Sequence, residues 1–259
     1  MSLKVFITGA SSGIGEALAL QYAANGATLG LAARRTDVLE QLRWRIASQF
    51  GSSTVDIYAA DVTNASTLAG VASEFIARHG VPDIVIACAG ISMVVNSERA
   101  QDLPAFRQVL ETNVVGTMAT FQPFLTAMKA RGSGTLVGIA SVAGIRGLPG
   151  ASAYSASKAA VISYCESLRV EMRGTGVKVL TICPGYIRTP MTAGIQYPTP
   201  FLIDAPVFAQ RAVLVIAAGT SYATIPWQMS WVAKLLKLLP NGLYDLMMGK
   251  ARRKHVGKH

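Results

Sequence analysis

The chain of 259 residues contains little that is typical of an extracellular or membrane-spanning protein. It has only three cysteines, Cys88, Cys165 and Cys183, and all of them lie in apolar stretches without the spacing of metal ligands. A sparse, odd cysteine count predicts a reducing compartment such as the cytoplasm, with no disulfide framework and no metal site. We expect no secretory signal, because an apolar strand begins almost at Met1. No uncharged apolar run reaches the roughly 18 residues that predict a transmembrane helix.

Acidic residues are also scarce. The 14 aspartates and glutamates are outnumbered by 24 lysines and arginines, which makes the formal net charge +10. The excess is uneven, because residues 221–259 contain seven lysines and arginines and a single acid, Asp245. A short basic end without a nucleic-acid-reading fold is usually a solvated tail, so we expect no nucleic-acid partner.

Internal linkers, repeats and low-complexity tracts are absent from the sequence, which favours one large domain. Apolar strand patterns alternate with helical patterns along it, at 4–8, 29–33, 55–60, 83–88, 134–140, 177–182 and 222–225, with a further helix predicted at 206–218. This alternation predicts an α/β fold: a doubly wound, Rossmann-type parallel sheet over residues 1–225, with helices on both faces. Residues 226–259 would form a C-terminal helical extension.

The first strand passes directly into a glycine-rich turn, Gly9-Ala10-Ser11-Ser12-Gly13-Ile14-Gly15, which a helical pattern follows. Strand, glycine turn and helix form the context of a phosphate-binding loop. Glycines let a ligand approach the backbone, and the helix N-terminus supplies free amides and the positive end of its dipole. The turn therefore predicts a site for the pyrophosphate of a dinucleotide.

A second pattern suggests acid–base chemistry. Tyr154 and Lys158 are four residues apart, so a helix would place the phenol and the ammonium on one face. A phenol normally has a pKa near ~10, and a neighbouring cation lowers that pKa toward neutrality. A hydroxyl such as that of Ser141, from another strand, could hold the oxygen that exchanges the proton. Alone, the same spacing is also typical of an ordinary surface helix.

Taken together, these motifs resemble the short-chain dehydrogenase/reductase family in its classical form, over about residues 3–225. Further matches follow in the family's order: Asp61-Val62, Asn113 in Glu111-Thr112-Asn113-Val114-Val115-Gly116, and Pro184-Gly185 with Thr189. The resemblance implies that the catalytic residues are Asn113, Ser141, Tyr154 and Lys158. It implies that the cofactor is bound by Gly9, Ser11, Ser12, Gly13, Ile14, Gly15, Arg34, Arg35, Asp61, Val62, Ala89, Gly90, Tyr154, Lys158, Pro184, Gly185, Ile187 and Thr189.

One position departs from the family pattern, because Cys88-Ala89-Gly90 stands where the family usually has Asn-Ala-Gly. A cysteine is a small, largely apolar substitute that forms weak hydrogen bonds. The difference puts the local rigidity of that strand end in doubt, and leaves the predicted chemistry unchanged.

The residues after the second strand predict the cofactor. An acid at position 33 would bind the adenosine ribose hydroxyls of NAD in this family, but this chain has Ala33 followed by Arg34 and Arg35. A guanidinium suits a 2′-phosphate, so we expect NADP(H). The alternative is that both arginines form a solvated basic corner.

By the resemblance, Tyr154 would protonate a substrate carbonyl while Ser141 orients it, Lys158 would also hold the nicotinamide ribose, and Asn113 would support a water in a proton relay. The expected pocket wall, from 92–96, 142–148 and 186–203, predicts a hydrophobic ketone or alcohol. Its apolar members are Val94, Val95, Ile145, Leu148, Ile187, Met191, Ile195, Tyr197, Phe201 and Leu202, with Arg146 and Arg188 as polar exceptions. A dinucleotide-sensing protein without turnover is the alternative function.

The extension has an amphipathic pattern. Trp227, Trp231, Leu235, Leu238 and Leu239 recur at helical spacing, Lys234 and Lys237 lie off that stripe, and a basic cluster follows. Such a segment could lie on an anionic membrane through residues 227–254, as a membrane-surface lipid or steroid reductase would require. It could equally cover the substrate pocket or form a subunit contact in a homodimer or homotetramer.

Overall fold

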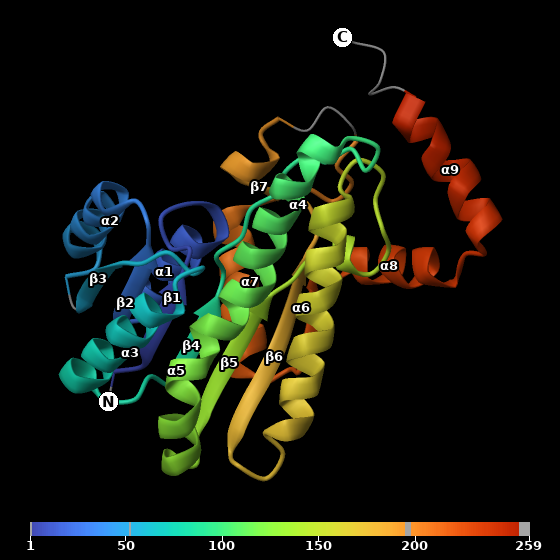
Figure 1. Cartoon of the computed structure of the whole chain (residues 1–259). Coiled ribbons are helices and arrows are strands. Elements are labelled where there is room, and N and C mark those ends of the chain that lie inside the picture. The colour runs from blue at the N-terminus through green and yellow to red at the C-terminus, as the bar shows by residue number, and fades with distance from the viewer. Residues whose placement is uncertain (1, 52, 195–197, 254–259) are drawn as a thin grey trace.

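The computed structural model describes residues 2–51, 53–194 and 198–253 (Figure 1). Its main sheet contains seven strands in the order β3-β2-β1-β4-β5-β6-β9, and every neighbouring pair is parallel. The strands are β1 (Lys4–Thr8), β2 (Thr28–Ala33), β3 (Val55–Ala59), β4 (Ile84–Ala87), β5 (Gly134–Ile139), β6 (Val177–Pro184) and β9 (Tyr222–Ile225). The short strands β7 (Ile187–Arg188) and β8 (Ile203–Asp204) pair separately.

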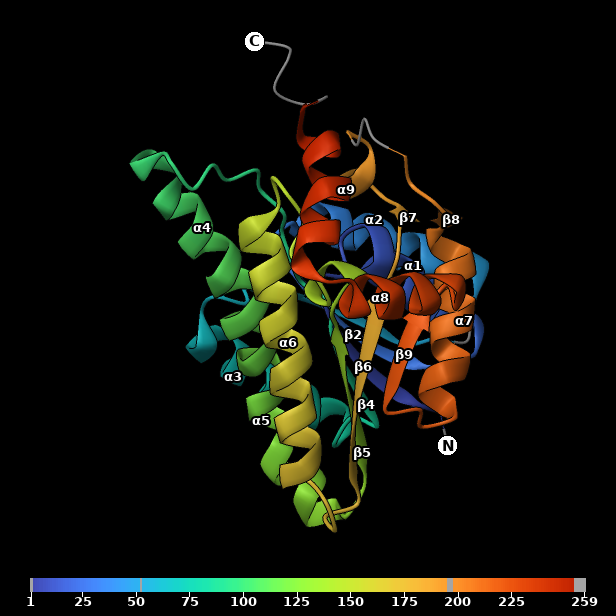
Figure 2. The same cartoon turned by 90° about the vertical axis from the view of Figure 1, so that its right-hand side faces the viewer.

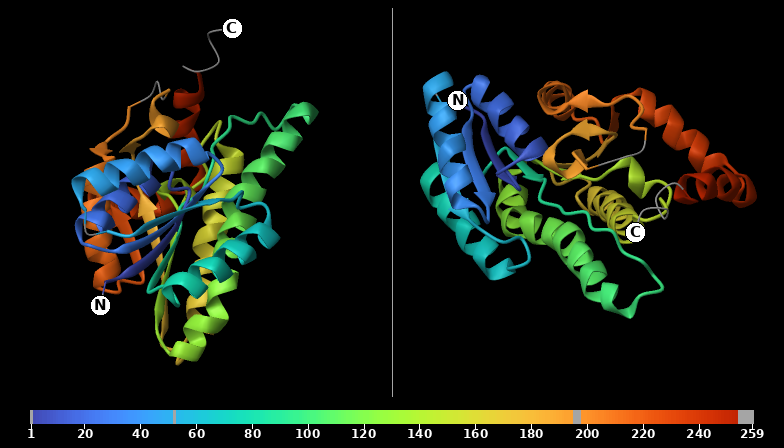
Figure 3. Two further views of the ribbon diagram at one scale, coloured as in Figure 1. Left: turned by 90° about the vertical axis from the view of Figure 1, so that its left-hand side faces the viewer. Right: turned by 90° about the horizontal axis from the view of Figure 1, so that it is seen from above.

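Helices cover both faces of this sheet (Figures 2 and 3). One face packs against α1 (Gly13–Ala24), α2 (Thr36–Gln49) and α7 (Ala205–Ala217), and the other against α3 (Ala65–His79), α5 (Gly116–Arg131) and α6 (Ser152–Glu171). The alternation of a strand explains the two cores, since Val5 and Ile7 of β1 face the first layer and Phe6 faces the second. The predicted doubly wound α/β fold is therefore confirmed.

Shorter helical segments complete the domain. The helix α4 (Leu103–Leu110) is preceded by η1 (Ala100–Asp102) and continues through the π-helical turn η2 (Glu111–Val115) into α5. Two short turns, η3 (Val142–Gly144) and η4 (Pro190–Thr192), follow β5 and β7.

The element boundaries differ from the sequence-based ones by one or two residues. The sixth strand continues to Pro184 instead of ending at residue 182, because Cys183 and Pro184 pair with Thr224 and Ile225 of β9. The predicted helix 206–218 begins one residue earlier, with Asp204 immediately before it. Partner strands fix these ends, and a single sequence does not reveal them.

The order of the strands reverses between β1 and β4, which are neighbours although two strands separate them in sequence. In an open parallel sheet, such a reversal leaves a crevice at the carboxyl ends of the strands. The turns that follow β1 and β4 are in close contact there, because a Cβ added to Gly9 would lie 2.6 Å from the Ala89 backbone.

The chain ends in α8 (Gln228–Leu238) and α9 (Asn241–Arg253), which follow β9 and project from one side of the domain (Figures 1 and 2). This is the predicted C-terminal helical extension. Within residues 2–51, 53–194 and 198–253, no helix has both the length and the apolar character needed to span a bilayer.

Candidate active site

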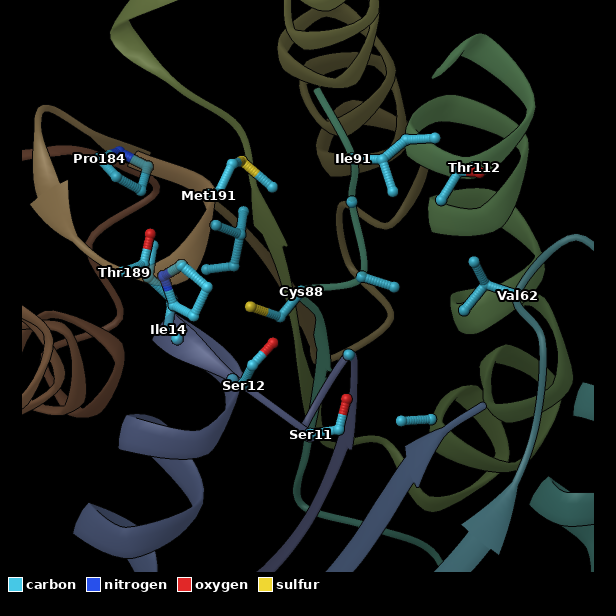
Figure 4. Close-up of a pocket in the computed structure, with 18 of the residues that line it drawn as sticks. Ser11, Ser12, Ile14, Val62, Cys88, Ile91, Thr112, Pro184, Thr189 and Met191 are labelled. Atoms are coloured by element: carbon cyan, nitrogen blue, oxygen red, sulfur yellow. The ribbon is translucent and has the colours of Figure 1, made fainter. Parts of the chain in front are cut away.

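A cavity of about 360 Å³ lies at the carboxyl ends of the strands, around the point where their order reverses (Figure 4). Every residue predicted to bind the cofactor lines it, as do the predicted catalytic residues Ser141, Tyr154 and Lys158. Its volume suits a small organic molecule. The fold thus brings motifs that are up to 180 residues apart, from Gly9 to Thr189, onto one surface.

The glycine turn requires glycine for a steric reason. Gly9 has φ +70°, a left-handed conformation that other residues rarely adopt. A Cβ on Gly15 would lie only 2.3 Å from the carbonyl oxygen of Gly9. A larger residue at position 15 would therefore force the turn to shift.

The N-terminus of α1 opens onto the same cavity, since its first residues Gly13 and Ile14 are part of the lining. The first amides of a helix have no acceptor within the helix. Ser12 occupies the N-cap position without capping through its side chain, and its hydroxyl instead accepts a hydrogen bond from Arg35 at 3.0 Å. This arrangement fits a bound phosphate group, because the amides remain available to an anion.

Two arginines border this end of the cavity. Arg35 also donates to the Ser11 hydroxyl at 3.0 Å, so it is bound to the glycine turn. Arg34 forms an exposed ion pair with Asp61 at 3.7 Å. A backbone hydrogen bond from Thr63, assisted by Arg34, holds the pKa of the Asp61 carboxyl below its usual range. Ala33 is buried beside them and carries no charge.

The cavity is also lined by Tyr154 and Lys158, both on α6, and by Ser141, which follows β5. Lys158 is buried, its ammonium donates to the Ile139 carbonyl at 2.8 Å, and it lies 5.7 Å from the centre of the Tyr154 ring. Burial lowers the pKa of Lys158 to about 8, which leaves it mostly cationic at neutrality. The Ser141 hydroxyl accepts a hydrogen bond from the Ala143 amide at 3.1 Å. A cation, a phenol and a hydroxyl are thus gathered at one site.

Asn113 differs from the other predicted residues, because it is buried in η2 and is not among the residues that line the cavity. Its amide bonds both backbone groups of Ile91, accepting at 2.8 Å and donating at 2.9 Å, and also donates to Ser157 at 2.9 Å. It therefore ties the segment after β4 to α6. Its role in a proton relay stays a prediction.

Cys88, the departure from the family pattern, lines the cavity and is labelled near the centre of Figure 4. Burial raises the pKa of its thiol to about 12, so the thiol is protonated at neutrality. Within the part of the chain that the structure describes, no group of three or more His, Cys, Asp or Glu residues is arranged to hold a metal ion.

The expected substrate wall is reproduced only in part. Ile187 and Met191 line the cavity, whereas Val95 packs into a separate small core with Val109, and Val94 points to solvent with 86% of its surface exposed. Arg188 pairs with Asp204 at 2.7 Å on the surface. Ile195 and Tyr197 lie outside the described residues.

Several residues that line the cavity were not predicted: Ala60, Ile91, Thr112, Ile139 and Ala140. Most of them adjoin a predicted motif, so proximity in sequence was an available signal. Ile91 and Thr112 approach the site from either end of the long connection between β4 and α5, next to Gly90 and Asn113 of the predicted motifs.

The loop after Ser141 is bound to the C-terminal extension. Arg146 donates to the carbonyl oxygens of Leu236 and Leu239 at 2.9 Å each, and its guanidinium lies 4.2 Å from the centre of the Tyr244 ring. The Tyr244 hydroxyl donates to the Gly147 carbonyl. A cation at the carbonyl end of α8 is favourable, because the helix dipole is negative there. The extension is thus joined to the loop that begins at the candidate catalytic serine.

Comparison with known proteins assigns the family. The model of the short chain dehydrogenase family matches residues 4–198. An uncharacterized oxidoreductase of Myxococcus xanthus is 39% identical over 95% of this chain and 96% of its own. An 11-beta-hydroxysteroid dehydrogenase-like protein of Arabidopsis thaliana is 34% identical over 91% of this chain and 77% of its own. The structure of a short-chain type dehydrogenase/reductase from Mycobacterium ulcerans superposes with a TM-score of 0.81 at 26% identity, covering 88% of this chain and 91% of the other. The chain belongs to the short-chain dehydrogenase family of oxidoreductases.

Proposed function

We propose that the chain interconverts a carbonyl group and an alcohol in an apolar small molecule, with NADP(H) as the preferred cofactor. The observation that carries this proposal is the convergence of Ser141, Tyr154 and Lys158 on a cavity that also borders the glycine turn. Residues 1–225 would form the catalytic domain and residues 226–259 an appended extension.

The residues around the cavity fit a dinucleotide. When bound, the nicotinamide would supply or accept the hydride. The amides at the start of α1 would bind the pyrophosphate, and Arg34 and Arg35 would bind the 2′-phosphate that distinguishes NADP from NAD. The neutral, buried Ala33 favours that phosphate, because an acid at this position would repel it.

The acid–base roles follow from charge. In the reductive direction, Tyr154 would give its proton to the carbonyl oxygen, and Ser141 would hold and polarise that oxygen. The cationic Lys158 would stabilise the phenolate that remains. Because Lys158 is buried, its charge is poorly screened by solvent and acts strongly on its neighbours.

The substrate class is inferred from the apolar lining. Met191 adds apolar surface to the side of the cavity opposite Ile91 (Figure 4). Ile187 also lines the cavity. The Arabidopsis relative carries the name of a hydroxysteroid enzyme, which supports a bulky apolar ketone or alcohol.

Replacement of Tyr154 by phenylalanine tests the chemistry. We expect Tyr154→Phe to lower turnover by about 100-fold or more, because it removes the acid, while NADPH binding changes little. A screen of apolar ketones followed at the nicotinamide absorbance band measures turnover, and fluorescence titration measures binding. Tyr164→Phe, on the same helix, is the matched control. Retention of most activity in Tyr154→Phe would defeat the assignment, and no turnover of any ketone by the wild type would favour a dinucleotide sensor.

Replacement of Ala33 by aspartate tests the cofactor. The wild type should use NADPH more efficiently than NADH, and Ala33→Asp should reverse the ratio of kcat/KM, because the carboxylate repels the 2′-phosphate and binds the ribose hydroxyls. A wild type that prefers NADH would contradict the NADP(H) assignment.

We also propose a homodimer or homotetramer. Val115, at the end of η2, and Met118, in the first turn of α5, are apolar and about half exposed, as expected of residues that meet a second copy. Light scattering after gel filtration measures the assembly, and a monomer at micromolar concentration would exclude it.

A further inference from the structure

The extension exposes its largest apolar side chains. Trp227, Trp231, Leu235 and Leu238 are 64%, 66%, 64% and 81% exposed. Their spacings of four, four and three residues place them on one stripe of α8. The helix is instead held to the domain by the smaller residues Met229 and Ala233, which are buried.

The second helix also exposes large apolar side chains. Leu243, Leu246 and Met247 of α9 are each about half exposed, whereas Tyr244 is turned inward onto the loop at Gly147. We call Trp227, Trp231, Leu235, Leu238, Leu243, Leu246 and Met247 the extension face. Monomeric proteins rarely expose so many large apolar side chains on two consecutive helices, so these helices indicate an interaction site.

The charge beside this face indicates the partner. The ammonium of Lys234 lies 5.1 Å from the centre of the Trp231 ring, and Lys237 is exposed one turn further on. The only acid in residues 221–259 is Asp245, among seven lysines and arginines. Tryptophans and leucines flanked by lysines match the interface of an anionic bilayer, where apolar groups enter the acyl region and cations meet the headgroups.

A second copy of the chain fits this face less well. In a twofold contact the same patch meets itself, so Lys234 and Lys237 of both copies would approach one another. Asp245 is the only acid near enough in sequence to offset them. An anionic lipid surface has no such repulsion.

We propose that the extension face docks on an anionic lipid surface and holds the domain there as a peripheral protein. The hydrogen bonds of Arg146 to Leu236 and Leu239, with its contact to the Tyr244 ring, join the docked helices to the loop after Ser141. Docking would therefore hold the candidate active site beside the bilayer, from which an apolar substrate could enter. The docking itself is independent of the proposed hydride transfer.

Vesicle sedimentation with the full chain tests the proposal. Vesicles of phosphatidylcholine containing phosphatidylserine should bind the chain at least tenfold more tightly than vesicles of phosphatidylcholine alone, and added salt should weaken the difference. Trp231→Ala combined with Leu235→Ser should lower binding about tenfold or more. Lys234→Glu and Lys237→Glu should each lower it by about fivefold or more, on phosphatidylserine vesicles only.

Two variants serve as matched controls. Trp44 on α2 is 76% exposed, more than Trp227 and Trp231, and Lys129 is an exposed lysine on α5. Trp44→Ala and Lys129→Glu should bind vesicles like the wild type. In Trp44→Phe, the remaining tryptophan fluorescence comes from Trp227 and Trp231 alone, so a blue shift of that fluorescence with vesicles reports insertion of the extension face.

The outcomes separate the partners. Failure of the wild type to bind phosphatidylserine vesicles overturns the proposal. An equal loss of vesicle binding in Trp44→Ala and in Trp231→Ala also overturns it. A smaller assembly of the Trp231→Ala, Leu235→Ser variant in light scattering, without vesicle binding by the wild type, would assign the face to a second copy. Tyr154→Phe should bind vesicles normally, so failure of the catalytic proposal is distinguishable from failure of this one.

Discussion

The cavity and the C-terminal extension are packed in opposite ways. At the cavity, small residues let backbones meet, as at Gly9 and Gly15, and the polar Lys158 and Asn113 are buried with hydrogen-bond partners. In the extension, large apolar residues such as Trp231 and Leu238 face outward, and two side chains, Arg146 and Tyr244, bind α8 and α9 to the domain. Substitutions at the cavity should therefore act on the whole fold, and substitutions in the extension should act locally.

The largest effect is expected at the glycine turn. In Gly15→Ala the new Cβ would lie 2.3 Å from a backbone carbonyl oxygen, so the turn must move. We expect a loss of about 1–3 kcal/mol in the free energy of unfolding and at least about a 100-fold weaker Kd for NADPH. Denaturant unfolding and fluorescence titration measure both. Wild-type affinity in this variant would show that the turn does not contact the cofactor.

The next effect concerns the buried ammonium. Lys158 has its pKa lowered from 10.5 to about 8 in the folded chain, so below pH 8 burial of the charge destabilises the fold by up to about 3 kcal/mol. The folded state loses this proton before the unfolded state does, so this contribution to stability rises with pH between about 8 and 10.5.

Lys158→Met should consequently raise the unfolding free energy of the cofactor-free protein at neutral pH, and its advantage should shrink as the pH approaches 10. Chemical denaturation of both proteins at several pH values measures the difference. A destabilised variant with a pH-independent difference would mean that the hydrogen bond to Ile139 outweighs the desolvation of the charge.

A smaller, local effect is expected at the junction between the two regions. Arg146→Ala removes the guanidinium that binds two carbonyl oxygens of α8 and stacks on Tyr244. We expect the local stability of α8 and α9 to fall by about 1–2 kcal/mol. Hydrogen exchange should therefore become faster in these two helices and stay unchanged elsewhere. Arg188→Ala, on an exposed ion pair, is the control. Exchange that accelerates equally in β1 and β4 would show that the extension supports the whole domain.

The smallest expected effect is a gain in the stability of the fold. Gly70 lies on the exposed side of α3, and a Cβ there would meet no atom within 4 Å. Gly70→Ala should stabilise the protein by about 0.5–1 kcal/mol, because alanine favours the helix. Thermal unfolding measures the stability of this variant and of Gly15→Ala side by side. A loss of stability in both variants would contradict the steric explanation for the turn.

Much of the fold and of the cavity lining could be predicted because the signals are local. The alternation of apolar strands with helices predicted the sheet, and the glycine turn predicted part of the cavity lining. The substrate wall was predicted less well. Val94 and Val95 adjoin in sequence, yet one points to solvent and the other packs on Val109, because the path of an irregular connection depends on distant contacts.

By itself, the sequence determined the order of the elements, the glycine turn at Gly9–Gly15 and the helical spacing of Tyr154 and Lys158, because each depends on residues that are near in sequence. The close approach of Gly9 to the Ala89 backbone was decided by the tertiary structure. Only the tertiary structure decided which side of α8 is buried. The amphipathic pattern marked the stripe of Trp231 and Leu235, but the space beside Gly185 accepts the Met229 side chain on the other side of the helix. The side of α8 with the smaller apolar residues therefore packs against the domain, and the side with the larger apolar residues stays exposed to solvent.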